Sequence, residues 1–270
     1  MENKKEHFFD QFPSFYETGK TGASHKELNE RFYPLIEKNL DILKNSTVLD
    51  IGSHDGRWSF AALKNGANKV IGIEGKEELV ELSKQNMQKY GIDSKHYEFI
   101  QGDITKETEK IPSKSIDIVF CLGVFYHITN HMELLRAIKK LQPKYLIMDT
   151  EINNSKAPIV RIREEPYKTP DKLIDYTKFV AGRTSKSALN MMLKSIDFSP
   201  EYFDWGNRIT DWKGFEIYSS KKSILLKRGI LYALSFFSDK KKRLKRRNDL
   251  IRYFTTKKII LIAKNKALWI

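Results

Sequence analysis

The chain of 270 residues contains one cysteine, no long apolar run and no recognised spacing of metal-ligand residues. The single cysteine, Cys121, excludes an internal disulfide and favours a cytosolic setting. No stretch reaches the roughly 18 apolar residues that a membrane-spanning helix needs, and the first residues, "MENKKEHFFDQF", lack an apolar stretch of signal-peptide length. The six histidines stand at no spacing typical of a zinc site, so we expect no bound metal.

The excess of positive charge is confined to one segment. The chain has 48 lysines and arginines against 34 acidic residues, a formal net charge of +14. Residues 221–258 hold 14 basic and 2 acidic side chains, so they carry +12 and the other 232 residues carry about +2 (14 − 12). This pattern predicts a local anionic partner or a solvated cationic helix, and not a basic surface over the whole protein.

Short aliphatic runs alternate with amphipathic segments as far as residue 151. "TVLDIG" (47–52) and "SIDIVFCLG" predict buried strands, and "KEELVELSKQNMQKYG" predicts a helix that stops near Gly91. Such alternation is typical of a parallel sheet covered on both faces by helices. "SPEYFDW" and "KKIILIAKN" (257–265) predict a sixth and a seventh strand.

The segments outside this alternation predict the domain organisation. Residues 1–44, rich in Phe and Tyr, are expected to form an N-terminal lid or brace, and residues 45–265 one α/β domain. Residues 151–184 have few periodic signals and are interpreted as substrate-side loops. Residues 219–256 are interpreted as a basic amphipathic insertion before the last strand.

The turn "DIGSHDG" after the first predicted strand stands where such sheets bind ligands. Gly52 permits a tight turn, and Gly56 permits close packing of helix and strand. His54 takes the slot where the dinucleotide fingerprint has glycine, which disfavours a pyrophosphate ligand. Glu74 ends the second strand 18 residues after Gly56 (74 − 56), close to the roughly 20 expected for a carboxylate that binds ribose.

"VLDIGSHDG", the acid that ends the second strand and "GDI" after the third strand together resemble the class I S-adenosylmethionine-dependent methyltransferases. The resemblance implies a Rossmann-like, doubly wound, seven-stranded α/β sheet whose last strand is antiparallel, with S-adenosyl-L-methionine as cofactor. It implies that Asp50, near the cofactor ammonium, and Gly52 hold the methionine part, while Glu74 binds the ribose hydroxyls. The other implied cofactor contacts are His54 and Gly56 in the turn, Asp103 with Ile104 at the adenine, and Leu122 with Gly123 beside the methionine.

Methyl transfer needs an aligned acceptor and, for a hydroxyl or an ammonium, a base that removes a proton. "GVFYHITNH" follows the fourth strand, and His127 is the first candidate base because histidine titrates near neutral pH. Tyr126 is the candidate for orienting the acceptor. Asp149 and Glu151, at the end of the fifth strand, are expected to bind acceptor hydroxyls or accept a proton.

Each of these residues also has a purely structural interpretation. His127 could be hydrogen-bonded behind the site, and Asp149 and Glu151 could cap a helix or form surface ion pairs. His54 is a second candidate base, with a turn residue as the alternative.

"GVFYHI", "MDTE" and "SKSAL" are similar to strings in the bacterial enzymes that carboxymethylate wobble uridine in tRNA. The chain has neither their long N-terminal extension nor a match to their set of cationic cofactor ligands, so their carboxylated cofactor is not inferred. The same strings occur in methyltransferases of small molecules and sugars, and the resemblance therefore leaves the acceptor open.

The basic insertion leaves three interpretations open. "ILLKRGILYALSFF" beside "DKKKRLKRR" is typical of an interfacial membrane helix, where each basic residue contributes roughly 1 kcal/mol near anionic lipid; this would suit a lipid-linked or glycolipid acceptor. Alternatively, the basic residues bind RNA phosphates while Phe236, Phe237 or Tyr253 stack on bases. In the third interpretation the insertion is a helical pair that only caps the sheet.

Three functional hypotheses follow. The first is a methyltransferase that acts on a hydroxylated small molecule, a sugar or a lipid-linked glycan. The second is a tRNA-modifying methyltransferase, and the third is a cofactor-binding protein without catalysis. The expected location is cytoplasmic, with peripheral binding at the inner face of the membrane if the insertion binds lipid.

Overall fold

The computed structural model describes residues 7–18, 25–166, 178–203, 209–210, 216–217, 258–265 and 267. The chain divides into two compact units, residues 1–201 with 258–270, and residues 202–257. In the second unit, β9 (Ile209–Thr210) pairs antiparallel with β10 (Glu216–Ile217). The predicted basic insertion, 219–256, lies outside the described residues.

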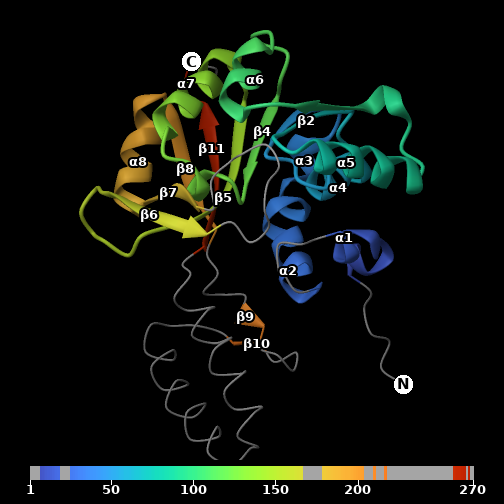
Figure 1. The fold of residues 1–270 in the computed structure, drawn as a ribbon, viewed down its shortest axis with the longest axis horizontal. Helices are drawn as coiled ribbons and strands as arrows, with labels where there is room; N and C mark the ends of the chain where they lie inside the picture. Colours follow the sequence, from blue (N-terminus) through green and yellow to red (C-terminus); the bar gives the residue numbers. More distant parts are fainter. Residues whose placement is uncertain are drawn as a thin grey trace, which may run out of the picture. The chain divides into compact units, whose positions relative to one another are not determined.

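A seven-stranded sheet forms the centre of the first unit (Figure 1). In spatial order its strands are β3 (Tyr97–Gln101), β2 (Lys69–Glu74), β1 (Thr47–Ile51), β4 (Ile118–Leu122), β5 (Tyr145–Glu151), β11 (Lys258–Asn265) and β8 (Phe198–Tyr202). The first five are parallel to one another, and β11 runs antiparallel to β5. The predicted doubly wound sheet with an antiparallel last strand is therefore confirmed.

The strand order reverses between β1 and β4, so right-handed crossovers place the connecting helices on both faces. The helices after the first strands are α4 (Arg57–Lys64), α5 (Glu77–Lys89), η3 (Ser94–His96), α6 (Ile104–Lys110), η4 (Phe125–His127), α7 (His131–Leu141) and α8 (Lys186–Ser195). α4 packs against β1 and β2, α5 against β2 and β3, and α7 against α6 and α8. β4 is buried along its whole length, Cys121 included, as expected for a central parallel strand.

An aromatic cluster attaches the N-terminal segment to the sheet domain. This segment forms η1 (Phe8–Gln11), α1 (Ser14–Glu17), α2 (His25–Leu35), η2 (Glu37–Asn39) and α3 (Leu40–Leu43). Phe15 is 1% exposed and packs against Phe60 of α4 and Tyr90 at the end of α5. The Ser14 N–H donates a hydrogen bond of 2.9 Å to the Tyr90 hydroxyl. Burying one phenylalanine contributes about 1.5–3 kcal/mol, so these contacts hold the segment firmly against α4 and α5.

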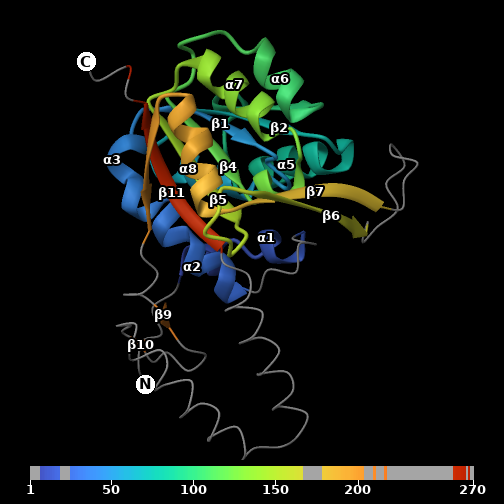
Figure 2. The same cartoon turned by 90° about the vertical axis from the view of Figure 1, so that its left-hand side faces the viewer.

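The segment interpreted as loops, 151–184, contains a β-hairpin. β6 (Val160–Pro166) and β7 (Lys178–Thr184) pair antiparallel, with Val160 opposite Thr184. Figure 2 shows the hairpin as a ribbon that extends outward from near the end of β5. The expectation of loops was wrong here because the apolar residues alternate with charged ones, which is the period of a strand with one apolar face.

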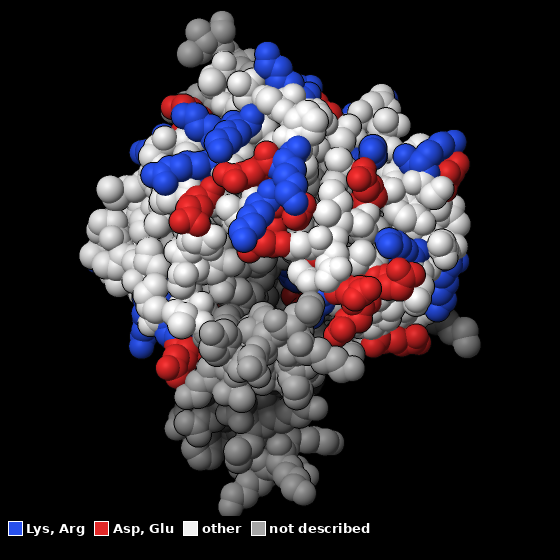
Figure 3. All heavy atoms as spheres, turned by 45° about the horizontal axis from the view of Figure 1, so that its top comes forward, with Lys and Arg blue, Asp and Glu red and all other residues white. Residues whose placement is uncertain are grey.

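Charges of both signs are interspersed on the face that carries α6 and α7 (Figure 3). Lys139 pairs with Asp197 at 2.7 Å, and Lys144 pairs with Asp117 at 2.8 Å. This matches the small charge excess outside residues 221–258. Within the described part of the chain, no helix is both long enough and apolar enough to span a membrane.

Candidate functional site

The turn after β1 contains three residues with left-handed backbone. Gly52, His54 and Gly56 have φ angles of +70°, +55° and +78°. A Cβ on Gly52 would lie 3.1 Å from the Val124 side chain, and a Cβ on Gly56 would lie 3.1 Å from Ser83. The two glycines thus meet both a conformational and a packing requirement, which leaves the turn close to the end of β4.

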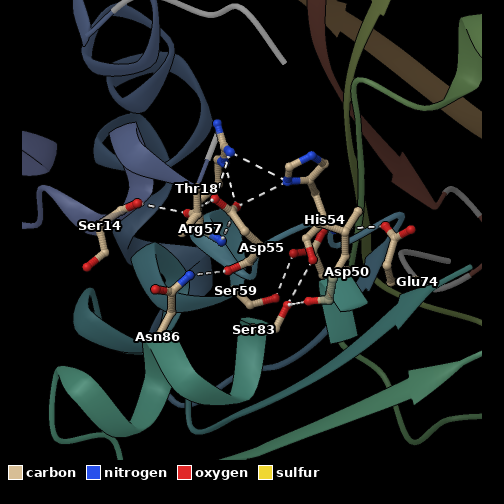
Figure 4. Close-up of polar contacts among 11 residues, drawn as sticks. Ser14, Thr18, Asp50, His54, Asp55, Arg57, Ser59, Glu74, Ser83 and Asn86 are labelled. Carbon is tan, nitrogen blue, oxygen red and sulfur yellow. Dashed lines mark hydrogen bonds and ion pairs between the residues drawn. The ribbon is translucent and has the colours of Figure 1, made fainter. Parts of the chain in front are cut away.

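His54 adopts a conformation that glycine takes at lower cost. Its backbone N–H donates a hydrogen bond of 3.0 Å to Glu74 Oε2, and its carbonyl accepts one of 2.8 Å from Ser83 Oγ. Its ring Nδ1 lies 3.5 Å from Asp55 Oδ1 (Figure 4). The backbone bonds offset the strain of the turn, so His54 can stand where the related pattern has glycine.

Glu74 ends β2 directly beside this turn. Its Oε2 accepts the His54 N–H, and its Oε1 accepts the Lys76 N–H at 3.2 Å. Two backbone donors therefore fix the carboxylate, and each oxygen keeps lone pairs for further donors. A carboxylate held in this way can accept hydrogen bonds from a pair of ribose hydroxyls.

Asp55 fixes the middle of the turn, and its partners were not predicted from the sequence. It is fully buried, and Arg57 donates to both of its oxygens, Nε to Oδ1 at 2.6 Å and Nη2 to Oδ2 at 2.7 Å. Thr18 of the N-terminal segment donates to Oδ2 at 2.7 Å, and Asn86 donates to the Asp55 carbonyl at 2.9 Å (Figure 4). Burial alone would raise the pKa of Asp55, but the hydrogen bond from His54 and the charge of Arg57 hold it well below its usual range.

Asp50 lies under the turn on β1 and is 1% exposed. The Ser59 hydroxyl donates a hydrogen bond of 2.6 Å to its Oδ2. Burial, with repulsion from Glu74 and Asp55, raises the pKa of Asp50 to about 7. Near neutral pH this carboxyl group is therefore only partly ionised.

Asp50→Asn is expected to flatten the dependence of stability on pH. The pKa of Asp50 is raised from 3.8 to about 7, so between these values the folded protein binds a proton that the unfolded chain has released. The free energy of unfolding should then fall as pH rises through this window, by up to about 1.4 kcal/mol per pH unit for one proton. Urea unfolding at several pH values from 5 to 8 tests this. Parallel curves for the wild type and the variant would contradict it.

Asp103 and Ile104 stand where β3 leads into α6. Asp103 is the N-cap of α6, and its Oδ1 accepts the N–H groups of Thr105 and Lys106, both at 3.0 Å. Asp103 thus has a structural role as a helix cap. A role at the adenine stays a prediction.

Leu122 and Gly123, at the end of β4, lie across from the turn. Gly123 has a φ of +85°, and the atom nearest to a Cβ built on it is Arg31 Nη2, at 3.9 Å. The chain therefore passes the carboxyl edge of the sheet here with little side-chain volume in front of it.

Tyr126 and His127 lie on η4, which begins two residues after Gly123 (125 − 123). His127 Nδ1 is 3.0 Å from Glu165 Oε2 of β6, and the two rings of Tyr126 and His127 are 4.1 Å apart. The His127 side chain is 41% exposed and that of Glu165 is 13% exposed. Burial, with the charges of Glu151 and Asp149, raises the pKa of Tyr126 to about 12. His127 is thus an accessible imidazole oriented by a carboxylate, and Tyr126 stays protonated.

Arg31 of α2 lies beside Asp149 of β5 and near Gly123 at the end of β4. Its Nη2 is 2.6 Å from Asp149 Oδ2, and its guanidinium lies over the Trp58 ring at 5.0 Å from the centroid. The Asp149 side chain is 1% exposed and that of Arg31 is 16% exposed. Asp149 was predicted at the site, whereas its cationic partner, 118 positions earlier (149 − 31), was not.

Glu151 ends β5 and pairs with the hairpin. Arg183 Nη2 of β7 is 2.5 Å from Glu151 Oε2 and 3.4 Å from Glu165 Oε1, and its guanidinium lies 5.8 Å from the centroid of the Tyr126 ring. Asp149 and Glu151 thus both form ion pairs, but the two carboxylates are buried and not at the surface. Their predicted roles toward an acceptor stay predictions.

His131 is a buried histidine that holds η4 against the hairpin. Its Nε2 is 3.0 Å from the carbonyl oxygens of Phe125 and Gly182. Burial lowers the pKa of His131, although the two carbonyls oppose that shift. A neutral ring that donates to both carbonyls ties the segment carrying Tyr126 and His127 to β7.

The residues present fit S-adenosylmethionine. Gly52 and Gly56 let a ligand come close to the backbone of the turn, and Glu74 beside it is a fixed carboxylate. The buried Ser53 hydroxyl has no hydrogen-bond partner among the described residues. A ligand with hydroxyl and amino groups would supply partners for such acceptors and donors. Among the described residues, no group of three or more His, Cys, Asp or Glu side chains could hold a metal ion.

Comparison with known proteins gives one family match and several partial relatives. Residues 42–201, more than half of the chain, match the family model described as a methyltransferase domain. A tRNA U34 carboxymethyltransferase from Helicobacter pylori is 28% identical over 135 residues, 49% of this chain and 51% of its own length. The enzyme of the same description from Desulfotalea psychrophila is 28% identical over 205 residues, 70% of this chain and 59% of its own length. The chain thus spans between about half and three fifths of the length of these curated relatives.

A solved structure shares the fold at low sequence identity. The S-adenosylmethionine-dependent methyltransferase from Mesorhizobium loti matches with a TM-score of 0.52 and 15% identity, covering 86% of this chain and 97% of its own. The family uses S-adenosylmethionine as its methyl donor. The predicted family, cofactor and Rossmann-like fold are thereby confirmed, and the chain belongs to the methyltransferase domain family.

Proposed function

We propose that this protein transfers a methyl group from S-adenosylmethionine to a hydroxyl group of a small molecule, a sugar or a lipid-linked glycan. The observation that carries the proposal is the position of His127 and Tyr126 shortly after Gly123, at the sheet edge where Glu74 and the turn after β1 fit the cofactor. The cofactor supplies a methyl group on a positively charged sulfur. Side chains of this protein must align the acceptor and remove its proton.

The cofactor is assigned to the carboxyl edge of β1, β2 and β4. Glu74 would accept hydrogen bonds from the ribose hydroxyls. Gly52 and Gly123 would leave room for the methionine part, and Asp50 would face the ammonium group of the cofactor. Gly56, His54 and Leu122 shape the turn around it. Asp103 and Ile104 border the adenine.

The acceptor hydroxyl is assigned to the space beside η4. The Glu165 carboxylate orients the His127 ring through its Nδ1 at 3.0 Å, and the ring is assigned the removal of the acceptor proton. The Tyr126 hydroxyl, protonated at neutral pH, donates a hydrogen bond to the acceptor. Asp149 and Glu151 are each paired with an arginine, and their negative charges help to keep Tyr126 protonated.

His127→Asn is expected to lower methyl transfer by about 10²–10⁴-fold, the usual contribution of a positioned base, while S-adenosylhomocysteine still binds as in the wild type. Transfer is measured as labelled methyl groups incorporated into small-molecule, lipid and RNA fractions of a cell extract. His96→Asn is the matched control, because the His96 ring bonds the Asn68 carbonyl and His96 directly precedes the first residue of β3, at the end of the strand opposite to the site. Equal transfer by His127→Asn and the wild type would remove His127 from the mechanism.

RNA is the second candidate acceptor, supported by the 28% identity to tRNA U34 carboxymethyltransferases. The two classes separate in a co-sedimentation experiment with anionic vesicles at moderate salt. Pelleting that survives excess tRNA and is lost on deletion of residues 221–250 favours a lipid-linked acceptor. Pelleting abolished by tRNA, with RNA affinity that falls steeply as salt rises, favours RNA. Cofactor binding without transfer to any fraction would favour a non-catalytic protein.

A further inference from the structure

The hairpin places two arginines directly opposite each other. In the register of β6 and β7, Arg161 pairs with Arg183, and Arg163 pairs with Ala181. Residues two apart on a strand share a face, so Arg161, Arg163 and Arg183 form one surface, here called the arginine face. Like charges directly opposite destabilise an antiparallel pair, so the arrangement calls for a compensating anion.

The carboxylates around the arginine face compensate only part of its charge. Glu165 contacts Arg163 and Arg183, and Glu151 contacts Arg183. Arg161 is exposed and forms no ion pair with any residue that the structure describes. Among the described residues, three guanidinium groups thus face two carboxylates, a local surplus of one positive charge before His127 is counted.

The charges of Arg161 and Arg183 act on Arg163, which lies on the same face of the hairpin. Burial and the neighbouring charges of Arg183 and Arg161 lower the pKa of Arg163, with Glu151 opposing them. Directly opposite residues of an antiparallel pair have Cβ atoms about 4.5–5.5 Å apart. At that spacing two guanidinium groups can bind the oxygens of a single phosphate, the planar recognition that arginine performs well.

The arginine face also borders the catalytic side of the site. Arg183 lies 5.8 Å from the centroid of the Tyr126 ring, and Glu165, which neutralises part of the face, bonds His127 at 3.0 Å. An anion held by Arg161 and Arg183 would therefore lie close to the reacting groups, where the acceptor itself would carry it.

We propose that the arginine face binds a phosphate group on a small acceptor, next to the hydroxyl group that is methylated. This rests on the proposed function and narrows its acceptor class to phosphorylated metabolites. One phosphate fits a surplus of about one charge, whereas nucleic acid requires contacts to many phosphates along a basic track, and outside residues 221–258 the chain has an excess of only about +2.

The test follows the arginine Nε–H signals of the full chain, labelled with ¹⁵N arginine, by NMR. Inorganic phosphate and a hexose 6-phosphate are titrated in separate samples at constant ionic strength, and each signal is assigned from its own Arg→Gln variant. We expect the signals of Arg161 and Arg183 to shift saturably with both probes. Arg161→Gln should weaken phosphate binding by about tenfold, as loss of a charge-assisted hydrogen bond predicts.

Arg136→Gln is the matched control, because Arg136 is exposed on α7 and the substitution removes the same charge. It should leave phosphate affinity within about twofold of the wild type. If Arg136→Gln and Arg161→Gln weakened phosphate binding equally, the binding would depend only on the net charge of the protein, and the proposal would be overturned. Arginine signals that respond to bulk tRNA, but to neither small probe, would also overturn it and assign the surface to RNA.

S-adenosylhomocysteine is titrated into the same samples to separate this proposal from the function on which it rests. The wild type and both variants should bind it alike, which also shows that they are folded. Saturable phosphate binding at Arg161 without any binding of S-adenosylhomocysteine would leave an anion site but remove its role in methyl transfer. Cofactor binding without phosphate shifts would overturn only the arginine face.

Discussion

Glu74→Ala is expected to weaken the binding of S-adenosylhomocysteine by about 100-fold. Glu74 is the carboxylate whose two oxygens are fixed by the N–H groups of His54 and Lys76. A hydrogen bond to a charged group contributes about 1.5–3 kcal/mol, and the substitution removes the acceptor for both ribose hydroxyls. It also leaves the His54 N–H without its partner, so the turn itself becomes less ordered. Isothermal titration calorimetry measures the change.

Glu98→Ala is the matched control for this experiment. Glu98 lies on β3, its side chain is 52% exposed, and Lys69 at 3.4 Å is its ion-pair partner. We expect its affinity for S-adenosylhomocysteine to equal that of the wild type. Glu74→Gln keeps the size of the side chain and should be intermediate. If Glu74→Ala, still folded, bound the ligand like Glu98→Ala, Glu74 would not be the ribose carboxylate.

Arg31→Ala is expected to lower the free energy of unfolding by about 3 kcal/mol or more. Asp149 is 1% exposed, and Arg31 at 2.6 Å is the cation beside it. Removing one partner of a buried pair leaves an uncompensated charge, which typically costs about 3–5 kcal/mol. The loss of the contact between Arg31 and Trp58 adds to this. Equilibrium unfolding in urea gives the difference.

The double variant Arg31→Ala/Asp149→Asn separates the buried charge from the lost packing. Asparagine at position 149 carries no charge, so the double variant should regain a large part of the stability lost by Arg31→Ala. Arg136→Ala, at an exposed position on α7, should change stability by less than about 0.5 kcal/mol. A double variant less stable than Arg31→Ala would show that Asp149 is not an unpaired charge in the single variant.

The sheet could be predicted because each of these strands is marked by a short pattern of neighbouring residues in the sequence. "TVLDIG" and "SIDIVFCLG" are aliphatic runs that end in glycine, and they contain β1 and β4, with strand ends one to three residues inside the predicted runs wherever the two differ. The cofactor turn was predictable for the same reason, since Gly52, Gly56 and Glu74 stand at a spacing set by one strand, one helix and the next strand. Short-range periodicity carries this information.

The acceptor side could not be predicted in the same way. Arg31 meets Asp149, and His127 meets Glu165 38 positions later, only because helices and strands from distant parts of the chain converge. The hairpin does carry a signal in the sequence, the alternation of Val160 and Ile162 with arginines. That pattern is short and highly charged, so its strand period is easily missed.

The crystal structure of the protein in complex with S-adenosylhomocysteine tests the central claim most directly. We expect the ribose hydroxyls within hydrogen-bond distance of Glu74 and the adenine beside Asp103. We also expect the sulfur to face the space in front of Tyr126 and His127. A ligand bound elsewhere, or a sulfur directed away from η4, would contradict the assignment of this sheet edge as the site of methyl transfer.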